Sequence, residues 1–373
     1  MIQNEKKRSL LVAPLRTGFV AILWTMLLGS NVDAQLAYHK LVGVGVDSSG
    51  RPWVSGTWDT GSDGVPDRIQ MTRYTTSGIE NLGFDPLSTS SEVALNIYGG
   101  GGVDLSTSGA QDQPWLIFDR DTEPDSTRND FASRRYNMAG VDTLGYGLDV
   151  ANPQIGSILR SAGVLQTNIL GNPVAPNHQL VLSILDSGAN AGKVQISRFN
   201  DLGNEAFGGV VNFGASDDLV PATVSGIGAG NQSGSSISSS QNLLFMVGTN
   251  NSGIEQIKAY SLDTYTEFSG WALDLPGTGP QHRFMSASGV GVDPVIGQPW
   301  IVGPFDSDGD GDRDNFTTRR YDPSTGFDNL GFGLSSTNGM IVDVEGIGID
   351  PVSRDPWFAV LLDTNSDSFG ERW

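Results

Sequence analysis

Residues 288–334 read SGVGVDPVIGQPWIVGPFDSDGDGDRDNFTTRRYDPSTGFDNLGFGL and form one complete structural unit. Two apolar runs, GVGVD and QPWIVGPF, are separated by a turn that contains Pro and Gly. An Asp-rich loop follows, and the runs FTTRRY and NLGFGL then flank a turn that ends at Gly326. Four short strands separated by turns, with no helical period between them, predict a small antiparallel β-unit.

The unit recurs along the chain. The Asp that closes its first strand appears at Asp47, Asp104, Asp293 and Asp350, and the spacing is 57 residues for the first and the last pair. The 189 residues between Asp104 and Asp293 hold three periods of 63, which leaves room for two weaker copies that begin near QLVLSILDSG and NLLFMVGTNN. We therefore expect six units, at about 41–93, 94–159, 160–218, 219–283, 284–339 and 340–373, the last of them incomplete.

This period predicts an all-β fold, a β-propeller of six four-stranded repeats of about 57–63 residues. A single four-stranded sheet cannot bury both of its faces, so neighbouring units stack around an axis. A β-sandwich or an open β-solenoid is the alternative. We expect the Trp that follows a Pro in four units to fill the packing layer between blades, although a ring platform for sugars is also conceivable. These residues are Trp53, Trp115, Trp300 and Trp357.

The second half of the unit combines an Arg-Tyr strand end, a Gly turn, and an Asp or Asn followed by Phe-Gly or Tyr-Gly. It appears at 73–84, 135–147, 198–208 and 320–333, with a weaker copy at 259–271. These segments resemble the delta-60 repeat family of bacterial proteins. The resemblance implies a β-propeller of exported or surface proteins without a defined enzymatic activity. This chain departs from that pattern in the Pro-Trp start of its second strand and in its Asp-rich loops.

The first 34 residues have the features of a signal peptide. A basic lead precedes an apolar run at 19–29, and Val32 and Ala34 occupy the small-residue positions of a cleavage site. A membrane anchor is the alternative, but the run is about half of the ~20 residues that a span needs. We expect the mature domain, 35–373, to be exported to the periplasm, the cell surface or the medium, with no membrane insertion after cleavage. The chain contains no cysteine, so its stability must come from core packing, repetition or metal.

The mature domain is strongly acidic. Removal of the signal peptide leaves 22 − 4 = 18 Lys and Arg against 42 − 2 = 40 Asp and Glu, a formal charge of −22. Such a surface repels nucleic acid and attracts cations. Nucleic acid is therefore excluded as a partner, and a protein or a glycan is expected instead.

The Asp-rich loop of the fifth unit is the strongest chemical signal. Counted from its first Asp, positions 1, 3, 5 and 9 are acidic and position 6 is Gly311. Alternate carboxylates turn toward one point, and the Gly allows the bend that brings later oxygens around a hard cation such as Ca²⁺. The loop resembles integrin-type (FG-GAP) calcium loops, and it departs from the EF-hand because position 12 is Thr317. The predicted ligands are Asp306, Asp308, Asp310 and Asp314.

Three other units carry weaker versions of this loop, whereas the third and fourth units have shortened loops for which no metal is expected. The alternative is a solvated Asp/Gly-rich hairpin without metal. The predicted ligands are Asp59, Asp63 and Asp67 in the first unit, Asp121, Glu123, Asp125 and Asn129 in the second, and Asp363, Asn365, Asp367 and Glu371 in the sixth. In a closed ring these loops would crowd one sector of one face.

The sixth unit stops at Glu371-Arg372-Trp373, where the fifth unit still has the runs FTTRRY and NLGFG to come. Either the chain is a fragment, or QLAYHKL (35–41) supplies a missing outer strand and closes the ring. The residues leave these alternatives open.

The function expected from these features is calcium-stabilised binding or scaffolding of a protein or a surface glycan. The alternative is a propeller enzyme that hydrolyses or cleaves glycans with two carboxylates about 5–10 Å apart. A catalytic pair should be unique within an array of repeats, and no pair stands out, so we assign no catalytic residue. Asp217, Asp218 and Glu345 are the single-copy acids to mutate first.

Overall fold

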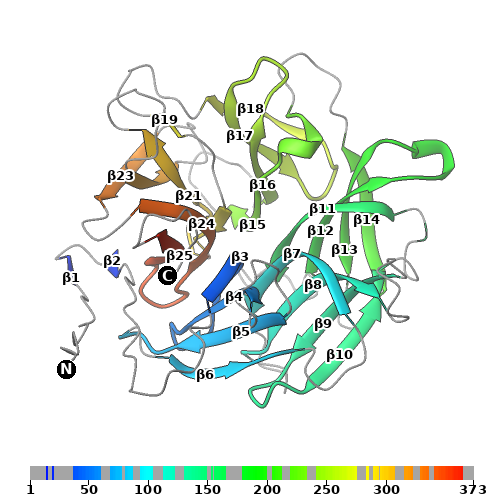
Figure 1. Ribbon diagram of the computed structural model, residues 1–373. Coiled ribbons are helices and arrows are strands. Elements are labelled where there is room, and N and C mark those ends of the chain that lie inside the picture. The colour runs from blue at the N-terminus through cyan, green and yellow to red at the C-terminus, as the bar shows by residue number, and fades with distance from the viewer. Residues whose placement is uncertain are drawn as a thin grey trace, which may run out of the picture.

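The computed structural model describes residues 14–15, 19–20, 37–59, 68–77, 80–86, 93–103, 112–121, 130–148, 153, 155–164, 179–199, 204–211, 219–232, 241–274, 283–284, 289–293, 295–306, 315–321, 328–335 and 340–363. Strands make up nearly all of the regular structure in these ranges. They assemble into a β-propeller in which the first strand of each sheet lies near the centre and the last lies at the rim (Figure 1).

Five sheets have four strand positions each, hydrogen-bonded in chain order and antiparallel. The first blade holds β3 (Ala37–Val46), β4 (Pro52–Asp59), β5 (Arg68–Tyr74) and β6 (Glu80–Phe84). The second holds β7 (Val93–Val103), β8 (Pro114–Asp121), β9 (Asp130–Tyr136) and β10 (Asp142–Gly147). The third holds β11 (Ile155–Val164), β12 (Gln179–Leu185), β13 (Val194–Phe199) and β14 (Glu205–Val211).

The fourth blade holds β15 (Gly226–Gln232), β16 (Gln241–Thr249), β17 (Glu255–Ser261) and β18 (Glu267–Asp274). In the fifth, β19 (Arg283–Phe284) and β20 (Gly289–Val292) share the inner position because both pair with β21 (Pro299–Asp306). The fifth blade continues with β22 (Asn315–Tyr321) and β23 (Asp328–Ser335). A separate small hairpin holds β1 (Pro14–Leu15) and β2 (Phe19–Val20).

The propeller fold agrees with the sequence analysis, but the expected count of six blades is wrong. Within the described residues there are five four-stranded blades, and the last repeat forms only a two-stranded sheet of β24 (Met340–Ile349) and β25 (Pro356–Asp363). This sheet lies between the fifth blade and the first, because β24 packs against β20 on one side and β3 on the other. The ring of inner strands is therefore closed.

The N-terminal strand rules out one of the two alternatives that the sequence left open for the last repeat. QLAYHKL does not supply an outer strand to the last sheet. Its residues 37–41 begin β3, the innermost strand of the first blade, and Ala37 pairs with Asp59. The strand shifts register between Tyr38 and Lys40 and again between Leu41 and Gly43, as expected for β-bulges that strengthen its twist.

Glycines in the first strands explain why the inner strands approach so closely. A Cβ added to Gly226 would lie 2.7 Å from the Cα of Gly289, and one on Gly289 would lie 2.9 Å from the Cα of Gly346. Gly346 meets the backbone of Gly43 in the same way, and Gly43 meets that of Gly100. The repeated Gly-x-Gly-x-Asp pattern therefore allows backbone-to-backbone packing around the axis.

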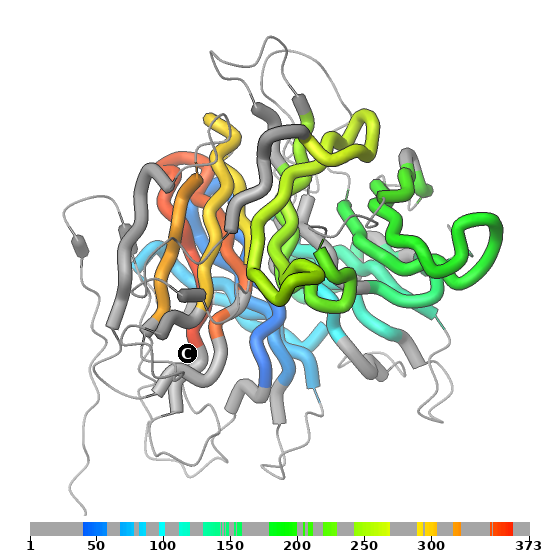
Figure 2. Tube along the Cα trace, turned by 90° about the horizontal axis from the view of Figure 1, so that it is seen from above, coloured from blue at the N-terminus to red at the C-terminus, as the bar shows by residue number. Residues whose placement is uncertain are grey.

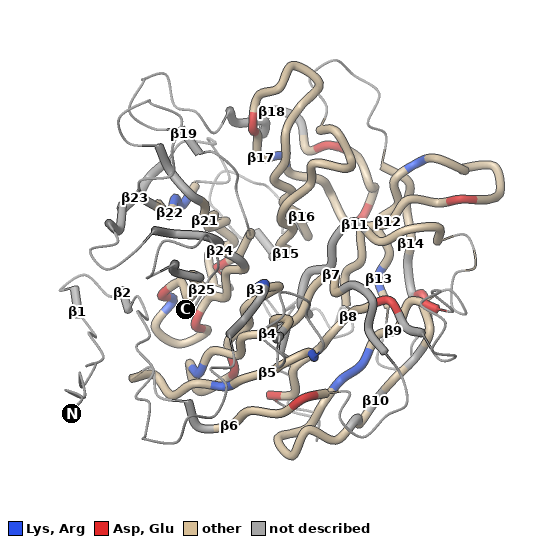
Figure 3. The backbone as a smooth tube through the Cα atoms, in the orientation of Figure 1, with Lys and Arg blue, Asp and Glu red and all other residues tan. Residues whose placement is uncertain are grey.

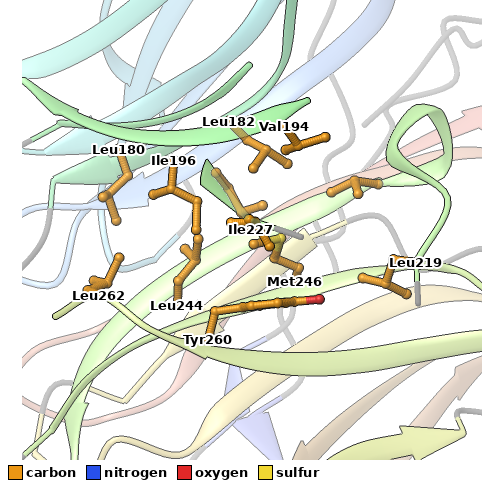
Figure 4. Close-up of a cluster of buried hydrophobic side chains, with 12 residues drawn as sticks. Leu180, Leu182, Val194, Ile196, Leu219, Ile227, Leu244, Met246, Tyr260 and Leu262 are labelled. Atoms are coloured by element: carbon orange, nitrogen blue, oxygen red, sulfur yellow. The ribbon is translucent and has the colours of Figure 1, made fainter. Parts of the chain in front are cut away.

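The hydrophobic core is divided into clusters between neighbouring blades. Figure 4 shows the cluster between the third and fourth blades, where Leu180, Leu182 and Ile196 face Leu244, Met246 and Tyr260. Similar clusters lie between the first and second, second and third, fourth and fifth blades, and between the fifth blade and the β24–β25 sheet. Each blade is thus stabilised by its neighbours, as a repeat of half-buried sheets requires.

Candidate functional site

The four predicted metal loops leave the ring from equivalent points. The strands β4, β8, β21 and β25 each have eight residues, begin with Pro-Trp and end with the first acid of a loop. Pro is tolerated at the first residue of a strand, and the Trp beside it is buried in every case. The loops therefore start at one repeated position, occupied by Asp59, Asp121, Asp306 and Asp363.

These four positions share one face of the ring. The inner strands run parallel to one another, since Gly43 and Gly45 meet the backbone near Gly346 and Gly348 in the same order. Consecutive strands within each blade are antiparallel, so every second strand ends on the same face, which we call the loop face. The opposite face carries the turns that join first to second strands, and we call it the turn face. Figure 2 shows the strands running between the two faces.

The loop starts also lie in consecutive sheets, because the inner strands contact one another in the order β20, β24, β3 and β7. Among the described residues, no group of three or more His, Asp or Glu is arranged to hold a metal ion. The metal-ligand assignments therefore stay predictions. Most of the predicted ligands lie outside the described residues, as do the single-copy acids Asp217 and Asp218. These ligands are Asp63, Asp67, Glu123, Asp125, Asn129, Asp308, Asp310, Asp314, Asn365, Asp367 and Glu371.

The short loops of the third and fourth blades are closed by their own hydrogen bonds. In the third blade Gly192 N donates to Leu185 O at 2.7 Å, and a single 3-10 turn, η1 (Gly188–Asn190), fills the loop. In the fourth, Asn250 Oδ1 accepts from the backbone N–H groups of Ser252 and Ile254, both at 2.9 Å. In these two hairpins, backbone N–H groups donate to the oxygens of Leu185 and Asn250, and these hydrogen bonds stabilise the turns.

The repeated Asp of the first strand has a structural role on the turn face. Asp47 Oδ1 accepts from the backbone N–H groups of Ser49 and Arg51 at 2.9 Å each. Asp293 does the same for Val295 and Ile296, and Asp350 for Val352 and Ser353. The three side chains are buried. Each carboxylate thus closes an Asx-type turn, which explains the recurrence of Asp in the Gly-x-Gly-x-Asp pattern.

Side chains also tie neighbouring turns together, and sequence analysis did not predict these links. Asp112 accepts from Ser48 N at 2.8 Å and from Ser48 Oγ at 3.0 Å, joining the second blade to the first. Arg354 Nε donates to Asp293 Oδ2 at 2.8 Å, joining the last sheet to the fifth blade. In the sequence, each link corresponds to a single polar residue within a turn. Such residues are too common to indicate a hydrogen-bond partner 61 or 64 residues away.

Replacing Asp293 should therefore destabilise the ring. In Asp293→Ala two backbone N–H groups and Arg354 lose their acceptor, and we expect the free energy of unfolding to fall by about 2–3 kcal/mol. Asp293→Asn keeps the turn acceptor and loses only the charge, so its cost should be smaller. Urea unfolding of both variants measures the difference. Equal stability of Asp293→Ala and the parent protein would contradict this role.

Arginines cover the buried tryptophans near the turn face. The guanidinium carbons of Arg73, Arg135 and Arg320 lie 5.6, 5.5 and 5.3 Å from the ring centroids of Trp53, Trp115 and Trp300. Each Arg directly opposes its Trp in the strand register. Figure 3 marks the basic residues on β5 and β9 in blue. The tryptophans are buried between blades, which confirms their expected packing role and leaves no sugar platform.

The Tyr that follows each of these arginines faces the other side of the sheet. Tyr74, Tyr136 and Tyr321 are buried, and Tyr136 lies 5.7 Å from Phe84 of the preceding blade. Burial is the main cause that lowers the pKa of Arg73, helped by Arg51 and opposed by Asp47 and Asp112. Arginine remains charged at physiological pH even so. The Arg-Tyr pair is thus an architectural element of the blade.

Two carboxylates that sequence analysis did not select flank the loop of the second blade. Asp119 and Asp130 are buried at the ends of β8 and β9, and Tyr98 donates its hydroxyl to Asp119 Oδ2 at 2.8 Å. The equivalent positions of the first blade hold Thr57 and Arg68, so these acids belong to this blade rather than to the repeat. Their single occurrence is the signal that could have found them.

Comparisons with known proteins support the fold and add no function. No family model matches the chain, and no curated protein matches it. Among solved structures, the Dos1 propeller aligns with a TM-score of 0.38 and 8% identity over 85% of this chain, which spans 65% of that protein's length. AofleA from Arthrobotrys oligospora aligns with a TM-score of 0.48 and 11% identity, over 90% of this chain and 82% of that one. A triple arginine-to-alanine mutant of AofleA gives 0.50 and 12% over the same shares.

These findings define the class of protein and leave the family open. The chain is a β-propeller, and the delta-60 resemblance rests on its sequence segments alone, since no family model matches. No helix among the described residues is long and apolar enough to cross a membrane.

Proposed function

We propose that this protein is an exported, calcium-binding β-propeller that presents its loop face to a protein or a surface glycan. The observation that carries the proposal is the repeated position of the loop starts. Asp59, Asp121, Asp306 and Asp363 stand at equivalent strand ends in four consecutive sheets, on one face. Asp-rich loops anchored in this way supply the carboxylate oxygens that a hard cation prefers.

The loop at 306–314 has the fullest ligand set, with four carboxylates within nine residues. The repulsion between these four carboxylates is most simply relieved by a bound cation. The loops at 59–67 and 121–129 carry the same pattern in part, and the buried acids Asp119 and Asp130 add negative charge beside the second of these. Calcium would hold these loops in one conformation and so create a rigid surface for a partner.

The structural role of the repeated acids that follow the first strands favours binding over catalysis. Those whose contacts are described bind backbone N–H groups and arginines, as Asp47 and Asp293 do, so they are engaged in holding turns. The acidic loops start in four consecutive sheets on one face, which suits multivalent contact with a repetitive ligand such as a glycan. The strong negative charge of the chain also favours a protein or a glycan over nucleic acid as the partner.

A glycan array tests the proposal. We expect residues 35–373 to bind at least one glycan class in calcium and to lose that binding in EDTA and in Asp310→Ala. Asp263→Ala is the matched control, because Asp263 is an exposed acid in the turn between β17 and β18. Retention of binding in EDTA would contradict the calcium requirement, and turnover of a glycan that one nonrepeated carboxylate controls would favour the enzyme instead.

A further inference from the structure

A turn of the fourth blade reaches across to the outer strand of the third blade. Tyr265 lies in the turn between β17 and β18, and a Cβ added to Gly209 of β14 would overlap its ring. Burial is the main cause that raises the pKa of Tyr265, and the charge of Arg198 on the third blade opposes it. Tyr265 has φ +57°, in the left-handed region that a bulky residue rarely adopts. An aromatic ring therefore covers a glycine of the neighbouring blade from a backbone position that itself favours glycine.

The first and second blades make the same contact with the two residue types exchanged. Gly140 lies in the turn between β9 and β10 with φ +72°, and a Cβ added to it would lie 2.8 Å from the ring of Phe84 on β6. Here the outer strand supplies the aromatic ring and the turn supplies the glycine. Phe84 and Tyr265 each pack against the core cluster of their own interface, the second of which is drawn in Figure 4.

The two outer-strand positions are equivalent in their blades. Phe84 opposes Met71 and Gly209 opposes Ile196, and each opposed residue lies three residues before the aromatic end of its third strand. A register shift follows at that strand end in both blades. The pairing therefore places a ring and a glycine at the same point of two different blades.

The two turn positions are equivalent as well. Gly140 N donates to Asn137 O at 3.0 Å, and Tyr265 N donates to Ser261 O at 2.8 Å. The residue after each one accepts a hydrogen bond from the N–H of the same partner, at 3.0 and 2.9 Å. Both positions lie two residues before the outer strand begins. The turns therefore share one conformation, in which the left-handed residue faces the preceding blade.

The repeats allow both positions to be compared along the chain. Two residues before the outer strand, four blades have glycine and only the fourth has an aromatic residue: Gly78, Gly140, Gly203, Tyr265 and Gly326. The outer-strand position is large and apolar in four blades and glycine only in the third: Phe84, Tyr146, Gly209, Leu273 and Phe332. The two exceptions are the two residues that meet.

Only one order of blades satisfies both exceptions. Tyr265 packed against an outer strand such as that of Phe84 would put two rings into the space of one, and glycine against glycine would leave a cavity. Similar repeats can otherwise pair wrongly, within one chain or between copies. We propose that Gly209 and Tyr265 form a matched pair that directs the fourth blade onto the third and excludes other neighbours. This assignment does not depend on the proposed calcium sites.

Exchanging the two residues tests whether they are matched. Gly209→Phe alone should raise the unfolding equilibrium constant, measured in urea, about 10- to 100-fold, as overpacking of a core does. Gly209→Phe with Tyr265→Gly recreates the contact of the first two blades and relieves the backbone strain, so its constant should lie within about threefold of the parent value. A double variant no more stable than Gly209→Phe would overturn the proposal. If Gly209→Phe does not fold, the double variant must still fold.

The reverse exchange tests whether a wrong neighbour is excluded. Gly140→Tyr gives the second blade the turn residue of the fourth, facing the aromatic outer strand of the first. We expect a loss of stability similar to that of Gly209→Phe, and Phe84→Gly in the same chain should reduce it.

Gly253→Tyr is the matched control for backbone strain. Gly253 has φ +78° and no heavy atom within 4 Å of an added Cβ, so a side chain there meets no neighbouring blade. A loss in Gly140→Tyr no larger than in this control would overturn the proposal, because a Tyr turn would then fit an aromatic outer strand. Absence of any recovery with Phe84→Gly would overturn it as well.

Discussion

Calcium at about 10 mM should raise the melting temperature of residues 35–373 by about 8–15 °C relative to EDTA. Four loops, at 306–314, 59–67, 121–129 and 363–371, are expected to bind with dissociation constants of ~10⁻⁴–10⁻³ M, the range of extracellular modules. Each site then contributes about 1.4–2.7 kcal/mol by mass action, or about 6–11 kcal/mol together. An unfolding entropy of ~2.1 cal/mol/K per residue converts this free energy into the stated shift for a domain of about 340 residues.

Magnesium at the same concentration separates specific binding from a general charge effect. It prefers a smaller octahedral site and retains its water, so its shift should be much smaller. Asp310→Ala removes a ligand from the fullest loop and should reduce the calcium shift by about a quarter, because one of four sites is lost. Equal shifts with calcium and magnesium, or no shift with either, would make these loops solvated hairpins.

Gly43→Ala should be among the most damaging single-methyl changes in the ring. The added Cβ would run into the carbonyl oxygen of Gly100 on the neighbouring inner strand, and both are backbone groups that cannot rotate away. The two strands must separate, which disturbs the packing of β3 against β7. We expect a loss of about 3 kcal/mol or more in the free energy of unfolding, at the upper end of overpacking effects. Urea unfolding measures it.

Gly253→Ala is the matched control for this substitution. Gly253 has φ +78° and no heavy atom within 4 Å of the added Cβ, so only backbone strain contributes. That strain costs about 1–2 kcal/mol. A loss in Gly43→Ala no larger than in Gly253→Ala would show that the inner strands do not need backbone contact.

Much of this fold was predictable because its repeat is written in short-range patterns. Alternation and turn residues located the strands, and the Pro-Trp start located the buried tryptophans. The blade count was wrong because the last repeat contains the Gly-x-Gly-x-Asp and Pro-Trp patterns, as GIGID and DPW, which indicate only where a unit begins. A blade is complete only when its third and fourth strands pair as well. The sequence left the role of QLAYHKL open, since the bulges in β3 break the alternation that would have joined residues 37–41 to GVGVD.

Some features of the candidate site were also predictable from the sequence, and others were not. The loop starts follow from strand length, because in these four strands eight residues counted from the Pro reach the loop face. The link from Arg354 to Asp293 could not be predicted, since it depends on how neighbouring sheets are rotated about the axis. Asp119 and Asp130 are less conspicuous in the sequence than the Asp-rich loops. Their single occurrence is a signal in the sequence, whereas their burial is seen only in the structure.

The contact between β24 and β3 has a consequence for the order of assembly. It joins segments roughly 300 residues apart, so it must wait for almost the whole chain and carries the highest loop-closure cost in the molecule. The blades can pack against one another in chain order during synthesis, whereas the contact between β24 and β3 forms last. No disulfide holds it shut. Its stability therefore comes from the packing of β24 and β25 against β3, which can form only after the first and last repeats have been brought together.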